Sequence, residues 1–132
     1  MEKLLYNKDS FIFNSMMDFG GKMKRRLKIL LIVSLCLFLS FWGISILRCE
    51  VLTVKHGHEF GNGYMETNMI SEPDYLKVLN YSNISARVYY VNKYSGNVIT
   101  FIKKDGSWHM TVWETIWSKY GSADDFIWPY IR

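Results

Sequence analysis

Three side chains near the middle of the chain have the chemistry of metal ligands. His56, His58 and Glu59 lie within four residues, and imidazole nitrogens together with a carboxylate can hold zinc. In an extended segment His56 and His58 would share one face, because side chains alternate along a strand. His109 is the only other histidine. Two interpretations are open, a metal-dependent enzyme and a solvated loop beside Gly57, and we favour the loop and predict no cofactor.

A second group of candidate residues is aromatic and lies towards the C-terminus. Exposed rings could stack on glycans, accept a peptide or lie at a membrane interface. Aromatic residues at strand spacing are more often part of a core, and we favour that interpretation. The candidate binding surface consists of Trp108, Trp113, Trp117, Tyr120 and Trp128.

No motif for covalent or acid–base catalysis is recognisable. The sequence has no nucleophile elbow, phosphate-binding loop or paired-carboxylate motif, and Asp124-Asp125 is typical of a solvated turn. We therefore predict no catalytic residues and a non-enzymatic function.

The element that must position these residues is an apolar stretch, residues 29–47, which contains no charged side chain. As a helix rising about 1.5 Å per residue, it approaches the roughly 30 Å thickness of a bilayer core. The stretch predicts one transmembrane helix and a lipid bilayer as partner.

The net charge of +4 lies entirely on one side of that stretch. Residues 1–28 hold seven basic and three acidic side chains, whereas residues 48–132 hold nine of each. Basic clusters beside a span stay in the cytoplasm. We therefore expect residues 1–28 on the cytoplasmic side of the cell membrane and the C-terminal part on its outer side. The cluster adjoins the span and lacks aromatic context, which argues against nucleic-acid binding.

Residues 1–22 show no sustained periodicity and resemble a tail, which suggests that translation starts at Met23. Met-Lys-Arg-Arg followed by an apolar run also has the form of an export signal. Cleavage near Ser45 would release a secreted ligand-binding domain. We favour a retained anchor, because the apolar run continues past Ser45 to Leu47.

Residues 48–73 are predicted to be a loop-rich linker that opens with a short strand at 51–55. Gly57, Gly61 and Gly63 punctuate the segment and disfavour a long helix. Cys36 and Cys49 lie at opposite ends of a buried stretch, so no internal disulfide is expected.

Residues 74–132 predict an antiparallel β domain of short strands separated by turn residues. Asp105-Gly106 supplies the left-handed conformations that a two-residue hairpin turn needs. Residues 114–119 have two interpretations, an extension of the last strand through Trp117 and one turn of helix, and we favour the strand. The predicted strands are residues 75–81, 87–91, 98–103 and 108–113.

The second and third predicted strands are apolar on both faces, which a sheet open to water on one side would not be. Residues 50–72 and the aromatic C-terminus are the only segments that can cover them. This leaves room for a membrane or cell-envelope protein partner, or for a homodimer.

Residues 99–113, ITFIKKDGSWHMTVW, resemble the strand–turn–strand of small exported bacterial domains of the cystatin-like and NTF2-like type. The resemblance implies a helix packed across the sheet, and no residue role can be transferred. We thus predict one N-terminal transmembrane helix and a small, mainly β extracytoplasmic domain, an antiparallel meander or an α+β variant of it. Its expected function is binding.

Overall fold

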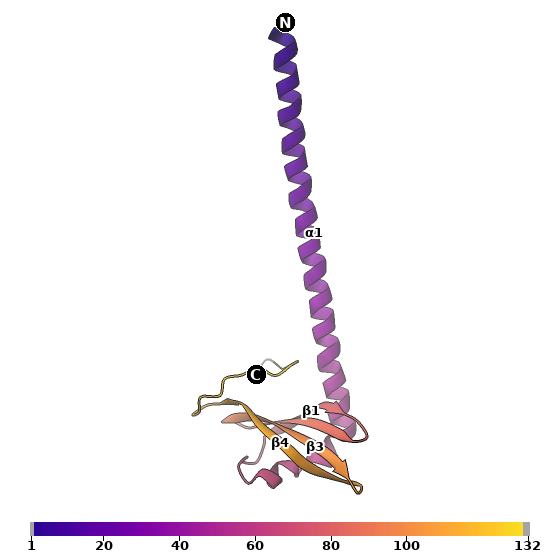
Figure 1. Cartoon of the computed structure of the whole chain (residues 1–132), viewed down its shortest axis with the longest axis vertical. Helices are drawn as coiled ribbons and strands as arrows, with labels where there is room; N and C mark the ends of the chain where they lie inside the picture. Colours follow the sequence, from indigo (N-terminus) through magenta and orange to yellow (C-terminus); the bar gives the residue numbers. More distant parts are fainter. Residues whose placement is uncertain (1, 131–132) are drawn as a thin grey trace. The chain divides into compact units, whose positions relative to one another are not determined.

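The computed structural model describes the backbone of residues 2–130 and the side chains of residues 23–130. A long helix is followed by two short 3₁₀ helices and four strands (Figure 1). The chain divides into two compact units, Met1–Phe41 and Trp42–Arg132. The elements are α1 (Glu2–His56), η1 (Gly57–Phe60), η2 (Gly63–Thr67), β1 (Tyr75–Tyr81), β2 (Ser85–Val91), β3 (Ser95–Lys104) and β4 (Ser107–Ser118).

The first unit contains only the part of α1 that precedes Trp42. Its side chains from Met23 to Phe41 are exposed, including the leucines, isoleucines and phenylalanines of the apolar stretch. Within the described residues, one helical stretch is long and apolar enough to cross a membrane. The backbone is helical from Glu2 onward, although residues 1–22 show no helical periodicity, because extending an existing helix costs less than starting one. The side chains of that predicted tail lie outside the described residues.

The second unit begins with the last turns of α1, and here the structure corrects the sequence prediction. The strand expected at residues 51–55 is wrong, because α1 continues through them to His56. The β-branched Val51, Thr53 and Val54 favour a strand locally, but they continue a helix that is already nucleated, so each adds a hydrogen bond without a new nucleus. The 3₁₀ turns η1 and η2 then follow, where the glycines break the helix.

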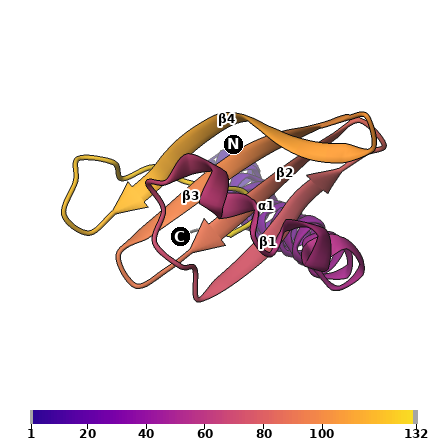
Figure 2. The ribbon, with the colours of Figure 1, turned by 90° about the horizontal axis from the view of Figure 1, so that it is seen from below.

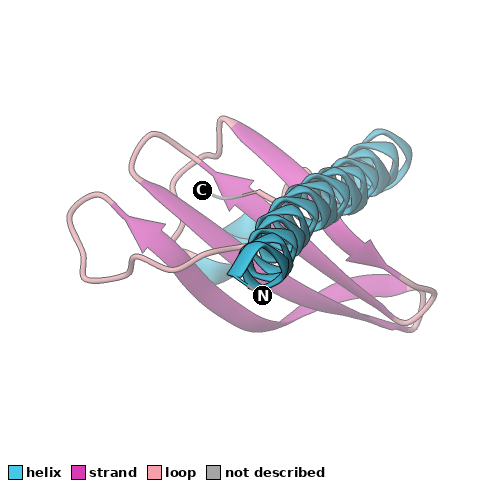
Figure 3. Cartoon of the chain, turned by 90° about the horizontal axis from the view of Figure 1, so that it is seen from above, coloured by secondary structure: helices cyan, strands magenta, loops and turns pink. Residues whose placement is uncertain are grey.

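The four strands form one antiparallel sheet, shown in magenta in Figure 3. Their order, labelled in Figure 2, is β1-β2-β3-β4, which is a meander. All four predicted strands are confirmed, with β2 and β3 beginning earlier, at Ser85 and Ser95. β4 continues to Ser118, which confirms the predicted extension of the last strand through Trp117. The β3–β4 turn has positive φ at Asp105 (51°) and Gly106 (82°), which is the conformation that the Asp-Gly pair predicts.

Both faces of the sheet are covered, as the apolar strands predict. On one face Val88, Tyr90, Ile99 and Phe101 are buried beneath Phe60 and neighbouring residues of the η1–η2 segment, which crosses the sheet in Figure 2. On the other face the C-terminal coil supplies cover through residues that include Ile127 and Tyr130. There the buried side chains are Tyr89, Val91, Val98, Ile116 and Ile127.

The outer edge of β1 is capped by the end of α1. The Thr53 hydroxyl accepts a hydrogen bond from the backbone N–H of Val78 (2.8 Å) and donates one to the Cys49 carbonyl (2.7 Å). The Cys49 thiol contacts the Leu79 carbonyl at 3.8 Å, at the point where the β1–β2 register shifts. An edge strand carries unpaired backbone groups, and the helix thus satisfies two of them while fixing its own position.

The Thr53 hydrogen bond yields a test of this joint. Thr53→Val keeps the side-chain shape but leaves the N–H of fully buried Val78 without its acceptor, at a cost of about 1–3 kcal/mol. We expect the Tm of the detergent-solubilised full chain, followed by tryptophan fluorescence, to fall by at least ~4 °C. Thr111→Val is the matched control, because the Thr111 hydroxyl bonds the Thr100 carbonyl at an exposed site. Equal Tm values for the two variants would contradict the capping role.

Candidate functional site

The structure brings two of the three predicted metal-ligating residues together. His56 ends α1 and Glu59 lies in η1, and His56 Nδ1 is 2.7 Å from Glu59 Oε1. The His56 ring also stacks on Tyr81 of β1, with the ring centroids 3.6 Å apart. His58 instead lines a neighbouring cleft. Among the described residues no group of three His, Cys, Asp or Glu side chains could hold a metal ion.

Glu59 is the centre of a network of hydrogen bonds that joins three segments. Besides His56, its carboxylate accepts hydrogen bonds from the indole Nε1 of Trp108 (2.8 Å) and the hydroxyl of Tyr81 (3.2 and 3.3 Å). Phe60 packs beneath the network, with ring centroids 5.2 Å from Trp108 and 6.3 Å from Tyr81. Glu59 therefore ties η1 to both β1 and β4.

The electrostatics of Glu59 follow from these partners. Partial burial raises the pKa of the carboxyl group, but the hydrogen bonds from Trp108, His56 and Tyr81 outweigh burial and hold the pKa below its usual value. Burial, and then the charge of this carboxylate, raise the pKa of Tyr81. An ionised carboxylate with three donors is a poor general base, and its three hydrogen bonds hold η1 against β1 and β4.

A cleft of about 280 Å³ lies beside this network. Its lining includes His58, Asn62, Glu66 and the edge of Trp108. Glu66 is engaged there, because its carboxylate accepts a hydrogen bond from the backbone N–H of Met110 (2.9 Å). The cleft is polar and shallow, and its two carboxylates already have partners.

The predicted aromatic surface is divided between several environments. Trp108 packs against the cluster that contains Phe60, whereas Trp117 packs against the cluster that contains Tyr89. The Trp117 indole donates a hydrogen bond to the Tyr89 hydroxyl (2.7 Å), and the Trp113 indole donates one to Asn97 (3.3 Å). These three tryptophans are thus held by contacts within the domain.

The remaining two members of that surface lie further along the chain. Tyr120 is 79% exposed and stacks on Tyr94 with ring centroids 5.9 Å apart. Trp128 is 36% exposed and belongs to the C-terminal coil, which covers the sheet. The five rings do not form a single row.

A second cleft was not predicted from the sequence. It has a volume of about 440 Å³ and is lined by the end of α1, by β1 and β2, and by the C-terminal coil. Arg48 and Arg87 contribute its charges, and Phe126 and Trp128 contribute aromatic rings. The only sequence signal for it was the aromatic C-terminus, since Arg48 and Arg87 lie on elements that only the fold brings together.

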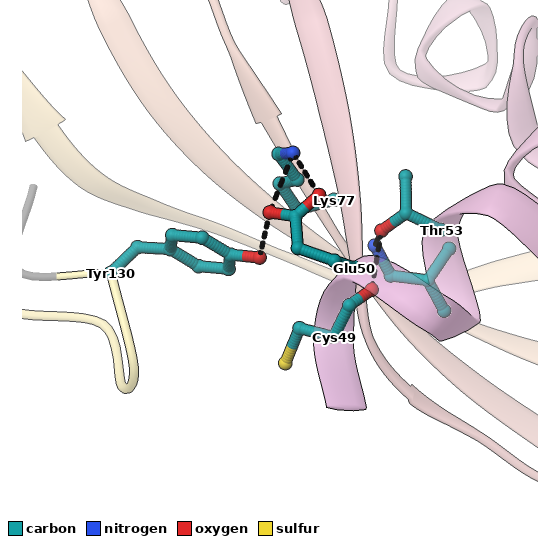
Figure 4. Close-up of polar contacts among 6 residues, drawn as sticks. Cys49, Glu50, Thr53, Lys77 and Tyr130 are labelled. Carbon is teal, nitrogen blue, oxygen red and sulfur yellow. Dashed lines mark hydrogen bonds and ion pairs between the residues drawn. The ribbon is translucent and has the colours of Figure 1, made fainter. Parts of the chain in front are cut away.

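Two hydrogen bonds fix the C-terminal coil beside this cleft. The Trp42 indole of α1 donates a hydrogen bond to the Pro129 carbonyl (2.9 Å). The Tyr130 hydroxyl donates one to Glu50 (2.8 Å), which also accepts from Lys77 of β1 at 2.6 and 2.7 Å (Figure 4). Lys77 and then Tyr130 hold the pKa of Glu50 below its usual value, while burial and Glu50 raise that of Tyr130.

The chain is therefore a small antiparallel β domain attached to a long helix with one apolar stretch that could span a membrane. No protein-family model, curated protein or solved structure matches it. The resemblance of residues 99–113 to exported bacterial domains stays a prediction, and functional inference rests on this chain's own residues.

The Glu59 network predicts a pH dependence of stability. A carboxyl whose pKa is lowered by folding contributes stability that is complete above its unfolded pKa, about 4.3, and is lost as the pH falls through the folded value. Trp108→Phe removes one donor to Glu59. We expect it to lower the Tm by at least ~4 °C at pH 6.5, with the difference from the parent chain shrinking by pH 3.

Trp113→Phe is the control, because the Trp113 indole bonds the neutral Asn97. Its Tm difference from the parent chain is expected to be the same at both pH values. A pH-independent difference for Trp108→Phe as well would show that Glu59 is not charged in the folded protein.

Proposed function

We propose that this chain is a single-pass membrane protein with its N-terminus in the cytoplasm. Its domain, residues 48–132, acts outside the membrane by binding and not by catalysis. The partner is a protein of the membrane or cell envelope, or a second copy of the chain. The bilayer itself holds the anchor.

The exposed apolar helix carries the proposal. Residues 29–47 present large apolar side chains to the surroundings, with Leu30, Leu37 and Ile44 each more than 60% exposed. A soluble protein rarely exposes a continuous apolar surface of this size. A helix satisfies its own backbone hydrogen bonds, so such a segment is suited to lipid.

The distribution of charge supports the orientation. The basic side chains at positions 24, 25, 26 and 28 immediately precede the apolar stretch and are exposed in the helix. The C-terminal part has no net charge. Lysine and arginine beside a span remain on the cytoplasmic side, where they also meet anionic lipids.

The structure around Ser45 favours a retained anchor over a cleaved signal. Ser45 lies within α1, and Trp42 on its N-terminal side is hydrogen-bonded to Pro129 at the far end of the domain. A secreted product beginning near Ile46 would lose this contact. The turns of α1 from Trp42 onward thus belong to the same compact unit as the domain.

The middle of the outer edge of β4 suits a protein partner. β4 is the long outer strand, and its exposed residues include Val112 (57%) and Trp113 (38%). Unpaired backbone groups on an outer strand can accept a strand from another chain. The edge of β1 is capped by Thr53. The outer edge of β4 is occupied at Met110 by Glu66 and at Ile116 and Ser118 by the chain that follows, so pairing is proposed between these positions, at residues 111–115.

Cysteine labelling in intact cells tests the orientation. In a background with Cys36→Ala and Cys49→Ala, Ser122→Cys is expected to react with a membrane-impermeant maleimide. Its matched partner, Lys24→Cys, is present whether translation begins at Met1 or at Met23 and is expected to react only after permeabilisation. The reverse pattern would overturn the orientation, and recovery of a soluble product beginning near Ile46 would overturn the anchor.

A further inference from the structure

We propose that the cleft between α1, β1, β2 and the C-terminal coil binds the phosphodiester group of a membrane phospholipid. This inference deepens the proposed function and rests on the membrane anchor. Arg48 and Arg87 would hold the phosphate oxygens, and Phe126 and Trp128 would contact the glycerol and the first methylene groups. The cleft of about 440 Å³ is large enough for a headgroup.

The charge of the cleft selects an anion. Its described lining contains two guanidinium groups, from Arg48 and Arg87, and no carboxylate. Both side chains are exposed. A guanidinium presents a planar set of donors that matches a phosphate, and such charge-assisted hydrogen bonds are stronger than neutral ones. Asn80 adds a neutral amide to the same lining.

The position of the cleft selects a lipid as the source of that anion. Arg48 is the first residue after the apolar stretch, where the hydrocarbon core would give way to headgroups. Trp42 lies six residues before Arg48, about 9 Å along the helix axis towards the N-terminus. Its indole donates a hydrogen bond to the Pro129 carbonyl. The C-terminal coil therefore runs beside the last turns of the apolar stretch, at the depth of the interface.

The side chains on that coil suit this depth. Phe126 is 56% exposed and Trp128 36% exposed, and they flank the buried Ile127. Aromatic rings gather at the boundary between hydrocarbon and headgroups, where an apolar body with a polar edge is favoured. Two arginines and two aromatic rings in one cleft are the pattern expected for a phospholipid, which has both a phosphate and an apolar part. A free phosphate would have no apolar part to contact the rings.

A ligand titration tests the proposal on the purified full chain in dodecyl maltoside, a detergent without phosphate. Dihexanoylphosphatidylglycerol is the probe, and the readout is the Tm followed by tryptophan fluorescence. We expect a saturable rise in Tm, because a ligand that binds only the folded state stabilises it. Arg48→Gln/Arg87→Gln is expected to abolish the rise, and each single variant to weaken binding about 10-fold.

Lys93→Gln/Lys104→Gln is the matched control, since it removes the same charge from the β2–β3 turn and from the end of β3, both outside the cleft. It is expected to respond like the parent chain. Near-UV circular dichroism checks that the variants are folded, and Arg87→Gln alone decides the result if the double arginine variant is not. Equal responses of the arginine and lysine variants would overturn the proposal.

Two further ligands identify the source of binding. Inorganic phosphate producing the same shift at the same concentration would show a free-anion site and overturn the lipid proposal. Dihexanoylglycerol, which lacks phosphate, producing the same shift would overturn the role of the arginines. The titration is made in detergent, so its failure is distinguishable from failure of the anchor, which cysteine labelling detects separately.

Discussion

The structure of the C-terminal unit depends on the attachment of the end of α1 to the edge of β1. Thr53 accepts the hydrogen bond of a buried backbone N–H, and Cys49 and Glu50 contact the neighbouring residues of the same strand. Without a helix at residues 48–56 this edge would be open, and the η1–η2 segment would have no fixed starting point. The Glu59 network and both clefts follow from where this joint places the chain.

A four-stranded meander of this size has little interior of its own, and the chain compensates by covering the sheet twice. The segment before β1 crosses one face, and the segment after β4 covers the other. Each cover is fixed by a carboxylate that collects several donors, Glu59 on one side and Glu50 on the other. Two ionised groups thus hold segments that apolar contact alone would leave loosely attached.

The strands were predictable because their signals are local. β-branched and aromatic runs separated by Ser, Asn and Gly specify β1 to β4, and Asp105-Gly106 specifies one turn. The helix at residues 48–56 was mispredicted because its residues favour a strand when read alone. The hydrogen bonds of Glu59 and Glu50 were missed because they join distant positions, with Glu59 and Trp108 separated by 49 residues and Glu50 and Tyr130 by 80.

The hydrogen bond between Trp42 and Pro129 places the start of the folded domain before the end of the apolar stretch. Hydropathy changes at Arg48, whereas the compact unit begins at Trp42. The final turns of the apolar helix therefore belong to the folded domain as well as to the predicted span. A truncation or cleavage between Trp42 and Arg48 would therefore remove part of the folded domain together with part of the apolar stretch.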